Sequence, residues 1–291
     1  MMVTMIRATT SADTGSSHVA EGAQYIPVGT RPNPYLGAGF FWYTEGNSSY
    51  NALQADVSKR LRHGLQFRAN YTWSKNLDMN SGLTGAQASN QAQMILDRND
   101  VRRDWGPSAL SPKYQATISL HYDLPFRSGP SFTSRTLGGW QVDAIASLLS
   151  GFPFTPQVGS NRSGDGDTRN PDRPSLNPAF SGPVIIGTAQ QWFNPNAFIL
   201  PAYGTYGNLG RGTYAGPGLA NLDLALLKDT RLKESVKLQF RTEFFNTLNH
   251  TNLGTPNGTV FSNGAISSSA GIITATATTS RQIQFGLKLV F

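Results

Sequence analysis

Apolar and polar residues alternate one by one along seven segments of this chain. The segment LQFRANYTW, residues 65–73, shows the pattern most clearly, because its leucine, phenylalanine, alanine, tyrosine and tryptophan are separated by glutamine, arginine, asparagine and threonine. A period of two marks a β-strand whose two faces meet different surroundings. The seven segments cover residues 53–61, 65–73, 114–124, 140–148, 221–228, 236–244 and 283–291. Each has about the 9–11 residues with which a tilted strand crosses a bilayer.

The connections between these segments alternate in length. Three are short, at residues 62–64, 127–139 and 229–235, whereas three are long and rich in Gly, Asn, Pro, Ser and Thr, at 74–113, 151–218 and 246–280. An antiparallel up-and-down sheet then carries every long loop at one end, which is typical of an outer-membrane barrel with short periplasmic turns and long extracellular loops. The sequence therefore predicts an all-β protein that forms part of a transmembrane β-barrel.

A soluble or surface-attached β-sandwich is the alternative fold, with loops that bind carbohydrate or another partner. Aromatic residues near the strand ends favour the barrel, in which such rings meet the lipid headgroups. Near the loop ends of the strands these residues are Tyr71, Trp73, Tyr114 and Phe244, and near the turn ends they are Tyr122, Phe126, Trp140 and Phe291. In a sandwich, the same rings would instead form the core between two sheets.

Composition excludes several other classes of protein. Charged residues make up 14% of the chain, against about 25% in globular proteins. The net charge is +7, but the basic residues are scattered and their longest run is Lys59–Arg62, so we expect no nucleic-acid partner. The chain has no cysteine. It also has no apolar run of about 20 residues and no apolar stretch near its start that would act as a secretory signal.

Six stretches, taken together and in this order, carry a family resemblance. They are GNSSYNALQADVSKRLRHGLQFRANYTWSKNLD, GGWQVDAI, DRPSLNP, WFNPNAF, YGNLGRGTYAGPGLANLDLALLKD and LQFRTEFFNTLNHTNLGTP. From about Gly46 to Phe291, the chain resembles the barrel of TonB-dependent outer-membrane receptors, in particular the Oar-like branch that is abundant in Acidobacteria. The resemblance implies a non-enzymatic protein without a cofactor, located in the bacterial outer membrane.

The resemblance also implies that the chain is one part of a larger receptor. Complete receptors of this family carry a signal peptide, a plug domain, a segment that contacts TonB and about 22 strands. We expect residues 46–291 to supply seven to eight strands at the C-terminal end of such a barrel, and residues 1–45 to be poorly structured apart from one more short strand near Phe40–Tyr43. The implied function is ligand capture and energised uptake, for which this chain alone is incomplete.

The resemblance names the expected partners as well. They are outer-membrane lipid or lipopolysaccharide, the barrel assembly machinery, the missing plug and N-terminal strands, TonB through that missing part, and a ligand that the sequence does not identify. In this family, an aromatic residue at the end of an alternating strand resembles the signal that the assembly machinery reads. The residues in that position are Ile283, Phe285, Leu287, Leu289 and Phe291.

The polar faces of the strands are the main candidate site. In a barrel they would line the interior and contact the plug and a passing ligand; in a soluble sheet they would only be a solvated face. The candidate lumen-lining residues are Gln66, Arg68, Asn70, Gln115, His121, Asp143, Lys237, Gln239, Arg241, Glu243, Gln284 and Lys288.

Other candidates for chemistry are weaker. Acidic and amide side chains gather in the stretch SGDGDTRNPD, where oxygen ligands at this spacing form a weak Ca²⁺ candidate. Those side chains are Asp165, Asp167, Asn170 and Asp172. None of the four histidines stands in a catalytic arrangement, and the glycines of GNLGRG, residues 207–212, are expected to permit tight turns.

Overall fold

The computed structural model describes most of the chain after residue 38. The described residues are 2–6, 24–25, 39–81, 92, 94–97, 100–126, 129, 131–164, 172–233 and 236–291.

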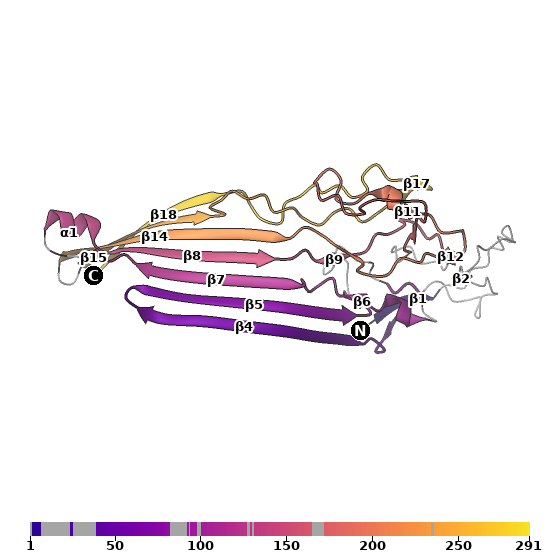
Figure 1. Cartoon of the computed structure of the whole chain (residues 1–291), viewed down its shortest axis with the longest axis horizontal. Coiled ribbons are helices and arrows are strands. Elements are labelled where there is room, and N and C mark those ends of the chain that lie inside the picture. The colour runs from indigo at the N-terminus through magenta and orange to yellow at the C-terminus, as the bar shows by residue number, and fades with distance from the viewer. Residues whose placement is uncertain are drawn as a thin grey trace.

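Seven long strands form one antiparallel sheet in which each strand pairs with the next long strand along the chain (Figure 1). They are β4 (Ser48–Arg62), β5 (Leu65–Asp78), β7 (Tyr114–Asp123), β8 (Trp140–Leu149), β14 (Leu219–Lys233), β15 (Val236–Phe245) and β18 (Gln282–Val290). The two-residue strand β6 (Gly106–Pro107) adds to β5. All seven predicted strands are confirmed, and so is their up-and-down order.

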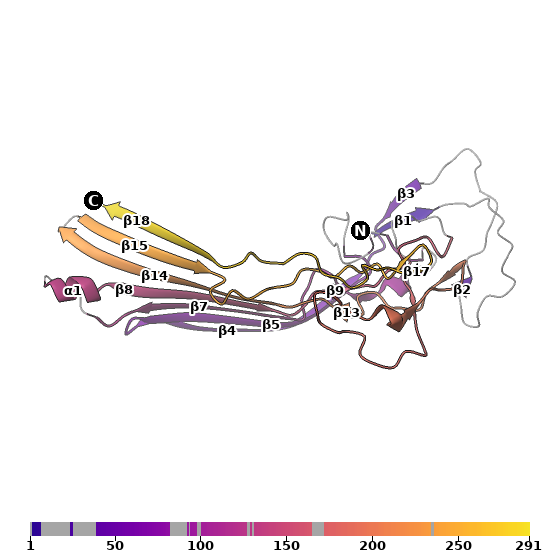
Figure 2. The ribbon, with the colours of Figure 1, turned by 90° about the horizontal axis from the view of Figure 1, so that it is seen from above.

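The strands form a single sheet, which excludes the two packed sheets of a sandwich. Figure 2 shows that this sheet curls, because β15 and β18 rise away from the plane of β4 and β5. The sheet is not closed: among the described residues, the outer edges of β4 and β18 pair with no other strand. The fold is therefore an open, curved portion of an antiparallel barrel.

Cross-strand register sorts the residues of the sheet onto two faces, because residues directly opposite each other point to the same side. One row of the apolar face runs across β4, β5, β7, β8 and β14 and consists of Val57, Ala69, Ile118, Ala146 and Leu222. Trp73 lies opposite Tyr114 on the same face, near the end of the sheet that carries the long loops. The apolar residues predicted to share one face of each strand therefore also share one face of the sheet.

Two strands extend beyond the alternating segments that predicted them. β5 continues to Asp78, which pairs with Ser48, and β14 runs from Leu219 to Lys233 with a register shift between Arg231 and Lys233. Backbone pairing needs only N–H and C=O groups, so a ladder continues where the apolar face has ended. Apolar alternation marks the part of a strand that faces an apolar medium, and it underestimates the length of the strand.

The turn end of the sheet holds one element that the sequence did not predict. The helix α1 (Phe132–Leu137) lies in the β7–β8 connection, and the Ser131 side chain caps it by accepting the Ser134 N–H. Lys228, on the apolar face of β14, points to this segment: its Nζ donates to the carbonyls of Arg135, at 2.7 Å, and of Gly138. These bonds bury an ammonium that would otherwise lie on an apolar surface.

The loop end of the sheet is covered by short elements from the three long connections. These are the 3-10 helices η1 (Val101–Asp104) and η2 (Pro195–Ala197) and the strands β9 (Pro153–Phe154), β10 (Ser175–Leu176), β11 (Phe198–Ile199), β12 (Thr205–Tyr206), β13 (Tyr214–Ala215), β16 (Phe261–Ser262) and β17 (Ala265–Ile266). We call this assembly the loop cap.

Residues 1–45 contribute three strands to the described structure. β1 (Met2–Ile6) pairs with β3 (Gly39–Tyr43), and β2 (Gln24–Tyr25) pairs with β12 of the loop cap. β3 includes the stretch Phe40–Tyr43, in which the sequence suggested a short strand.

The turn between β4 and β5 gives a test of the fold. His63 and Gly64 both have positive φ, at 54° and 76°, as a two-residue hairpin turn of this kind requires. A Cβ on Gly64 would lie 2.6 Å from the Asp123 carbonyl oxygen. We expect Gly64→Val to lower the free energy of unfolding of the whole chain in detergent micelles, measured by urea titration, by about 2 kcal/mol. His63→Asn is the matched control, because asparagine tolerates positive φ. Equal unfolding midpoints for the two variants would contradict this prediction.

Candidate functional site

The structure places all the candidate lumen-lining residues on one face of the sheet. The central row runs from Gln66 in β5 through His121 and Asp143 to Glu243 and then Gln284 in β18, with Ala225 of β14 in between. The other candidates lie one or more rows away on the same side. We call this surface the polar face.

Several charged groups on the polar face pair with one another. His121 Nδ1 lies 2.6 Å from Asp143 Oδ1 across the β7–β8 pair, and its Nε2 lies 3.4 Å from Asp123 on its own strand. Arg68 Nε donates to Asp56 at 2.8 Å. These pairs hold the side chains close to the sheet, where they form a polar wall.

The C-terminal half of the polar face carries two further ion pairs. Lys237 pairs with Asp229, whose other carboxylate oxygen accepts the Gln239 side-chain amide at 3.0 Å. Arg241 pairs with Glu243 along its own strand. The two residues are two positions apart in β15, so they extend on the same side and reach each other without help from a neighbouring strand.

The polar face is hollowed. A hollow of about 370 Å³ spans β5, β7, β8, β14 and β15, and its lining includes Gln66, Arg68, His121, Asp143, Arg241 and Glu243. A hollow that spans five neighbouring strands is expected where a sheet curves toward its polar side, as the wall of a barrel does.

Above the sheet, the loop cap has a hydrophobic core of its own. Phe154, Phe193 and Phe198 are almost completely buried, and their rings pack at centroid distances of 5.8 Å and 5.9 Å. Tyr214 packs against two of these rings, and Val260 of the last long connection completes the cluster. Two long connections, 150–218 and 246–281, therefore fold together.

Two buried arginines join the first long connection to the second. Arg211 donates through Nε to the Asp104 carbonyl at 2.6 Å and through Nη1 to Ser81 Oγ at 2.9 Å, and its Nη2 pairs with Asp78 at the end of β5. Arg173 Nη1 donates to the Asp104 carboxylate at 3.0 Å. Buried charges are stable only when they are paired in this way.

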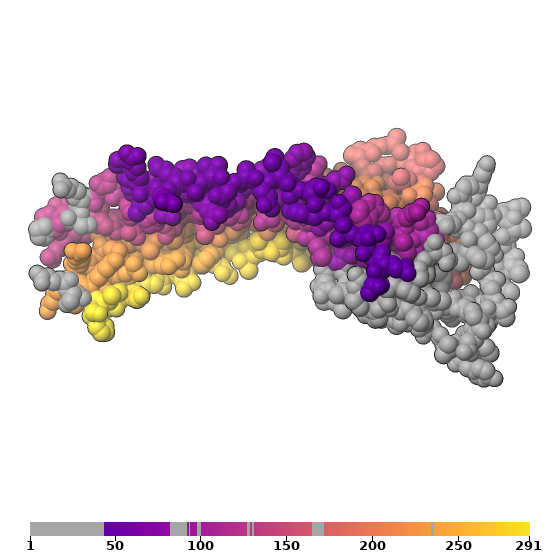
Figure 3. All heavy atoms as spheres, turned by 90° about the horizontal axis from the view of Figure 1, so that it is seen from below, coloured from indigo at the N-terminus to yellow at the C-terminus, as the bar shows by residue number. Residues whose placement is uncertain are grey.

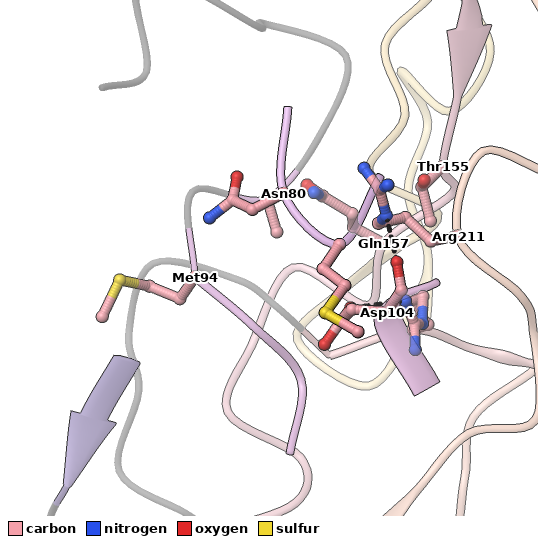
Figure 4. Close-up of a pocket in the computed structure, with 9 residues that line it drawn as sticks. Asn80, Met94, Asp104, Thr155, Gln157 and Arg211 are labelled. Atoms are coloured by element: carbon pink, nitrogen blue, oxygen red, sulfur yellow. Dashed lines mark hydrogen bonds and ion pairs between the residues drawn. The ribbon is translucent and has the colours of Figure 1, made fainter. Parts of the chain in front are cut away.

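Asp104 is the centre of this network. Its second carboxylate oxygen accepts the Leu96 N–H at 2.8 Å. Burial raises the pKa of Asp104 above its ordinary value, and the positive charge of Arg173 opposes that shift. Figure 4 shows Asp104, Arg211, Thr155 and Gln157 around a small cavity, with Met94 at its other side. The cavity measures about 10 Å³, enough for roughly one water molecule.

Sequence reasoning missed this network and the aromatic core, because it treated the long connections as loops without a core. Two signals were present: the aromatic clusters FPF and WFNPNAF, and an arginine inside GNLGRG. The expected tight turn is present at residues 211–212. Gly212 has a φ of +63°, and a Cβ on it would lie 2.5 Å from the Pro107 carbonyl oxygen.

The Ca²⁺ candidate is only partly within the described residues. Asp172 is buried and its Oδ2 accepts the Ser163 N–H at 2.7 Å, so this carboxylate fixes the loop backbone. Asp165, Asp167 and Asn170 lie outside the described residues. Among the residues that are described, no three potential ligands gather into a metal site.

The proposed assembly strand is the edge strand β18. Ile283, Phe285, Leu287 and Leu289 all lie on the apolar face and are about half exposed or more, and Phe291 is 92% exposed. An exposed apolar strand at a sheet edge is a template for pairing with a further strand. Its recognition by an assembly machinery stays a prediction.

Comparison with known proteins identifies the class. Residues 9–284 match the family of outer membrane beta barrel domains, and the chain belongs to this family. It is therefore a protein of the bacterial outer membrane. No curated protein matches the chain. In the part of the chain that the structure describes, no helix is long and apolar enough to cross a membrane.

The two faces of the sheet can be tested separately, because the chain contains no cysteine of its own. Ser119 and Ile118 are adjacent in β7, both exposed, and point to the polar and apolar faces respectively. In outer membranes, a membrane-impermeant maleimide should label Ser119→Cys at least about tenfold faster than Ile118→Cys, because lipid excludes water from the apolar face. Equal labelling would contradict a lumen on the polar side.

The arginine network gives a second prediction. Arg211→Met leaves Asp78 buried without its cation, which should destabilise the loop cap by about 3–5 kcal/mol. Hydrogen exchange measured by mass spectrometry should be faster for the backbone amides of residues 150–218 in this variant than in the wild-type chain. Arg102→Met is the matched control, because Arg102 lies exposed in η1 beside the same network. If the amides of residues 150–218 exchange as slowly in the Arg211 variant as in the Arg102 control, Arg211 does not stabilise the loop cap.

Proposed function

We propose that the chain is the C-terminal barrel part of a TonB-dependent outer-membrane receptor of the Oar-like branch, which captures a ligand at the cell surface for energised uptake. The observation that carries this proposal is the position of a folded loop cap above a hollowed polar wall. A general diffusion pore needs an open mouth, whereas a receptor needs a surface that is ordered before the ligand arrives.

The loop cap has the properties of such a surface. Its loops are held by an aromatic core and by buried arginine–aspartate pairs, so little conformational entropy remains to be lost when a ligand binds. Arg103 adds to this order by donating to the Gly207 carbonyl at 3.0 Å, with its guanidinium 5.1 Å from the Tyr206 ring centre. In this proposal, the cap binds the ligand and the polar wall contacts the plug and the passing ligand.

The two open edges support the second part of the proposal, that further strands complete the barrel. A lipid-exposed strand edge leaves backbone N–H and C=O groups without partners, at a cost of several kcal/mol for each group. The strands that join β4 and β18 would come from the N-terminal part of the receptor, together with the plug and the TonB-contacting segment. The chain would not transport a ligand without them, and we propose no catalytic activity for it.

Single cysteines at the two edges test this arrangement. Ala55→Cys lies in β4 and Leu287→Cys in β18, both on the apolar face. In its native membrane, each single variant should, after alkylation with a benzophenone maleimide and irradiation, form cross-links to receptor strands outside this chain, which mass spectrometry of the adducts would identify. The double variant, treated with a bis-maleimide, should form no link between its own two cysteines. An efficient link within one chain would mean that these strands close on themselves, and it would overturn the receptor proposal.

A further inference from the structure

A groove of about 730 Å³ lies where the sheet meets the loop cap, on the apolar side of β4 and β5. Leu53 and Trp73 form its floor; they lie directly opposite each other on the apolar face and are 60% and 50% exposed. Pro153 of β9 and Tyr214 of β13 line it from the cap. Figure 1 shows that the loop end of β5 lies close to β9 and β6.

The charge of the groove is positive. Lys75 and Lys113 both line it and are exposed, and no aspartate or glutamate is among its lining residues. Lys75 follows Trp73 by two positions, so its side chain leaves the sheet on the apolar side. Lys113 Nζ lies 5.2 Å from the centre of the Tyr114 ring, a cation–π contact that keeps the ammonium beside the apolar face.

The position of the groove indicates what occupies it. In an outer-membrane barrel, the apolar face contacts lipid and the long loops lie on the extracellular side. The groove therefore opens toward the outer leaflet, at the level where acyl chains give way to headgroups. An apolar floor with two cations at its upper rim matches a lipid that has an acyl chain below and an anionic headgroup above. A soluble ligand of the receptor would instead reach the lumen side.

We infer that this groove binds one phosphate-bearing lipid of the outer leaflet. An acyl chain lies along Leu53, Trp73 and Tyr214, and the headgroup phosphate pairs with Lys75 and Lys113. Such a lipid would fill the gap between the sheet and the cap and would hold the cap at a fixed height on the membrane surface. The inference depends on the family assignment and not on the receptor function.

The test uses the full chain in zwitterionic micelles and native mass spectrometry. The probe is a diphosphorylated, acylated glucosamine disaccharide lipid, compared with the same lipid after removal of its phosphates. The wild-type chain should bind the phosphorylated lipid about tenfold to thirtyfold more tightly, since each lysine near a membrane surface contributes about 1 kcal/mol. The double variant Lys75→Gln, Lys113→Gln should lose this preference.

Two further variants separate the groove from general effects of charge and folding. Lys288→Gln removes one charge from the polar face and should leave the preference unchanged. Ala215→Trp places a ring in the groove from β13 and should weaken binding of both lipids by about tenfold, although it changes no charge. Equal affinity for both lipids in the wild-type chain would overturn the inference. Displacement of the lipid by millimolar inorganic phosphate would also overturn it, because the site would then bind a soluble anion.

Discussion

Backbone hydrogen bonding inside a bilayer is the constraint on which the rest of this structure depends. Water is absent there, so each N–H and C=O group of a spanning strand must pair with a neighbouring strand. Five of the seven long strands, β5, β7, β8, β14 and β15, meet this requirement on both sides, because each pairs with its two neighbours. Among the described residues, β4 and β18 meet it on one side only, and this is the physical reason for proposing that other strands complete the barrel.

The same constraint separates the chemistry of the two faces. On the apolar face, the ammonium of Lys228 is buried because carbonyls of the α1 segment bind it. On the polar face, ionisable groups lie close together and pair directly, as His121 does with Asp143. One face is therefore suited to lipid and the other to water, although they are separated only by the thickness of one sheet.

The loop cap is stabilised in a different way from the sheet. It lies outside the membrane and has a buried core, like a small globular domain. Its phenylalanines bury apolar surface against one another, and its arginines satisfy carbonyls that loops without regular structure would leave unpaired. Arg211 connects this unit to the sheet through Asp78, at the end of β5. This ion pair holds the cap to the loop end of the sheet. In the space-filling view of Figure 3, the elongated sheet runs without a break into the described part of the cap.

The sequence by itself determined the strands, their order and their two faces. Each of these features is local: alternation within Leu65–Trp73 fixes which residues share a face, and alternating short and long connections fix the direction of each strand. The sequence did not determine α1, the partners of Lys228, or the Asp78–Arg211 pair, whose members are separated by more than a hundred positions. Contacts between residues so far apart in the chain produce no periodic pattern in the sequence, because they depend on how distant loops meet in space. Only the tertiary structure therefore decided that the long connections form one cap and that a basic, apolar groove lies beneath it.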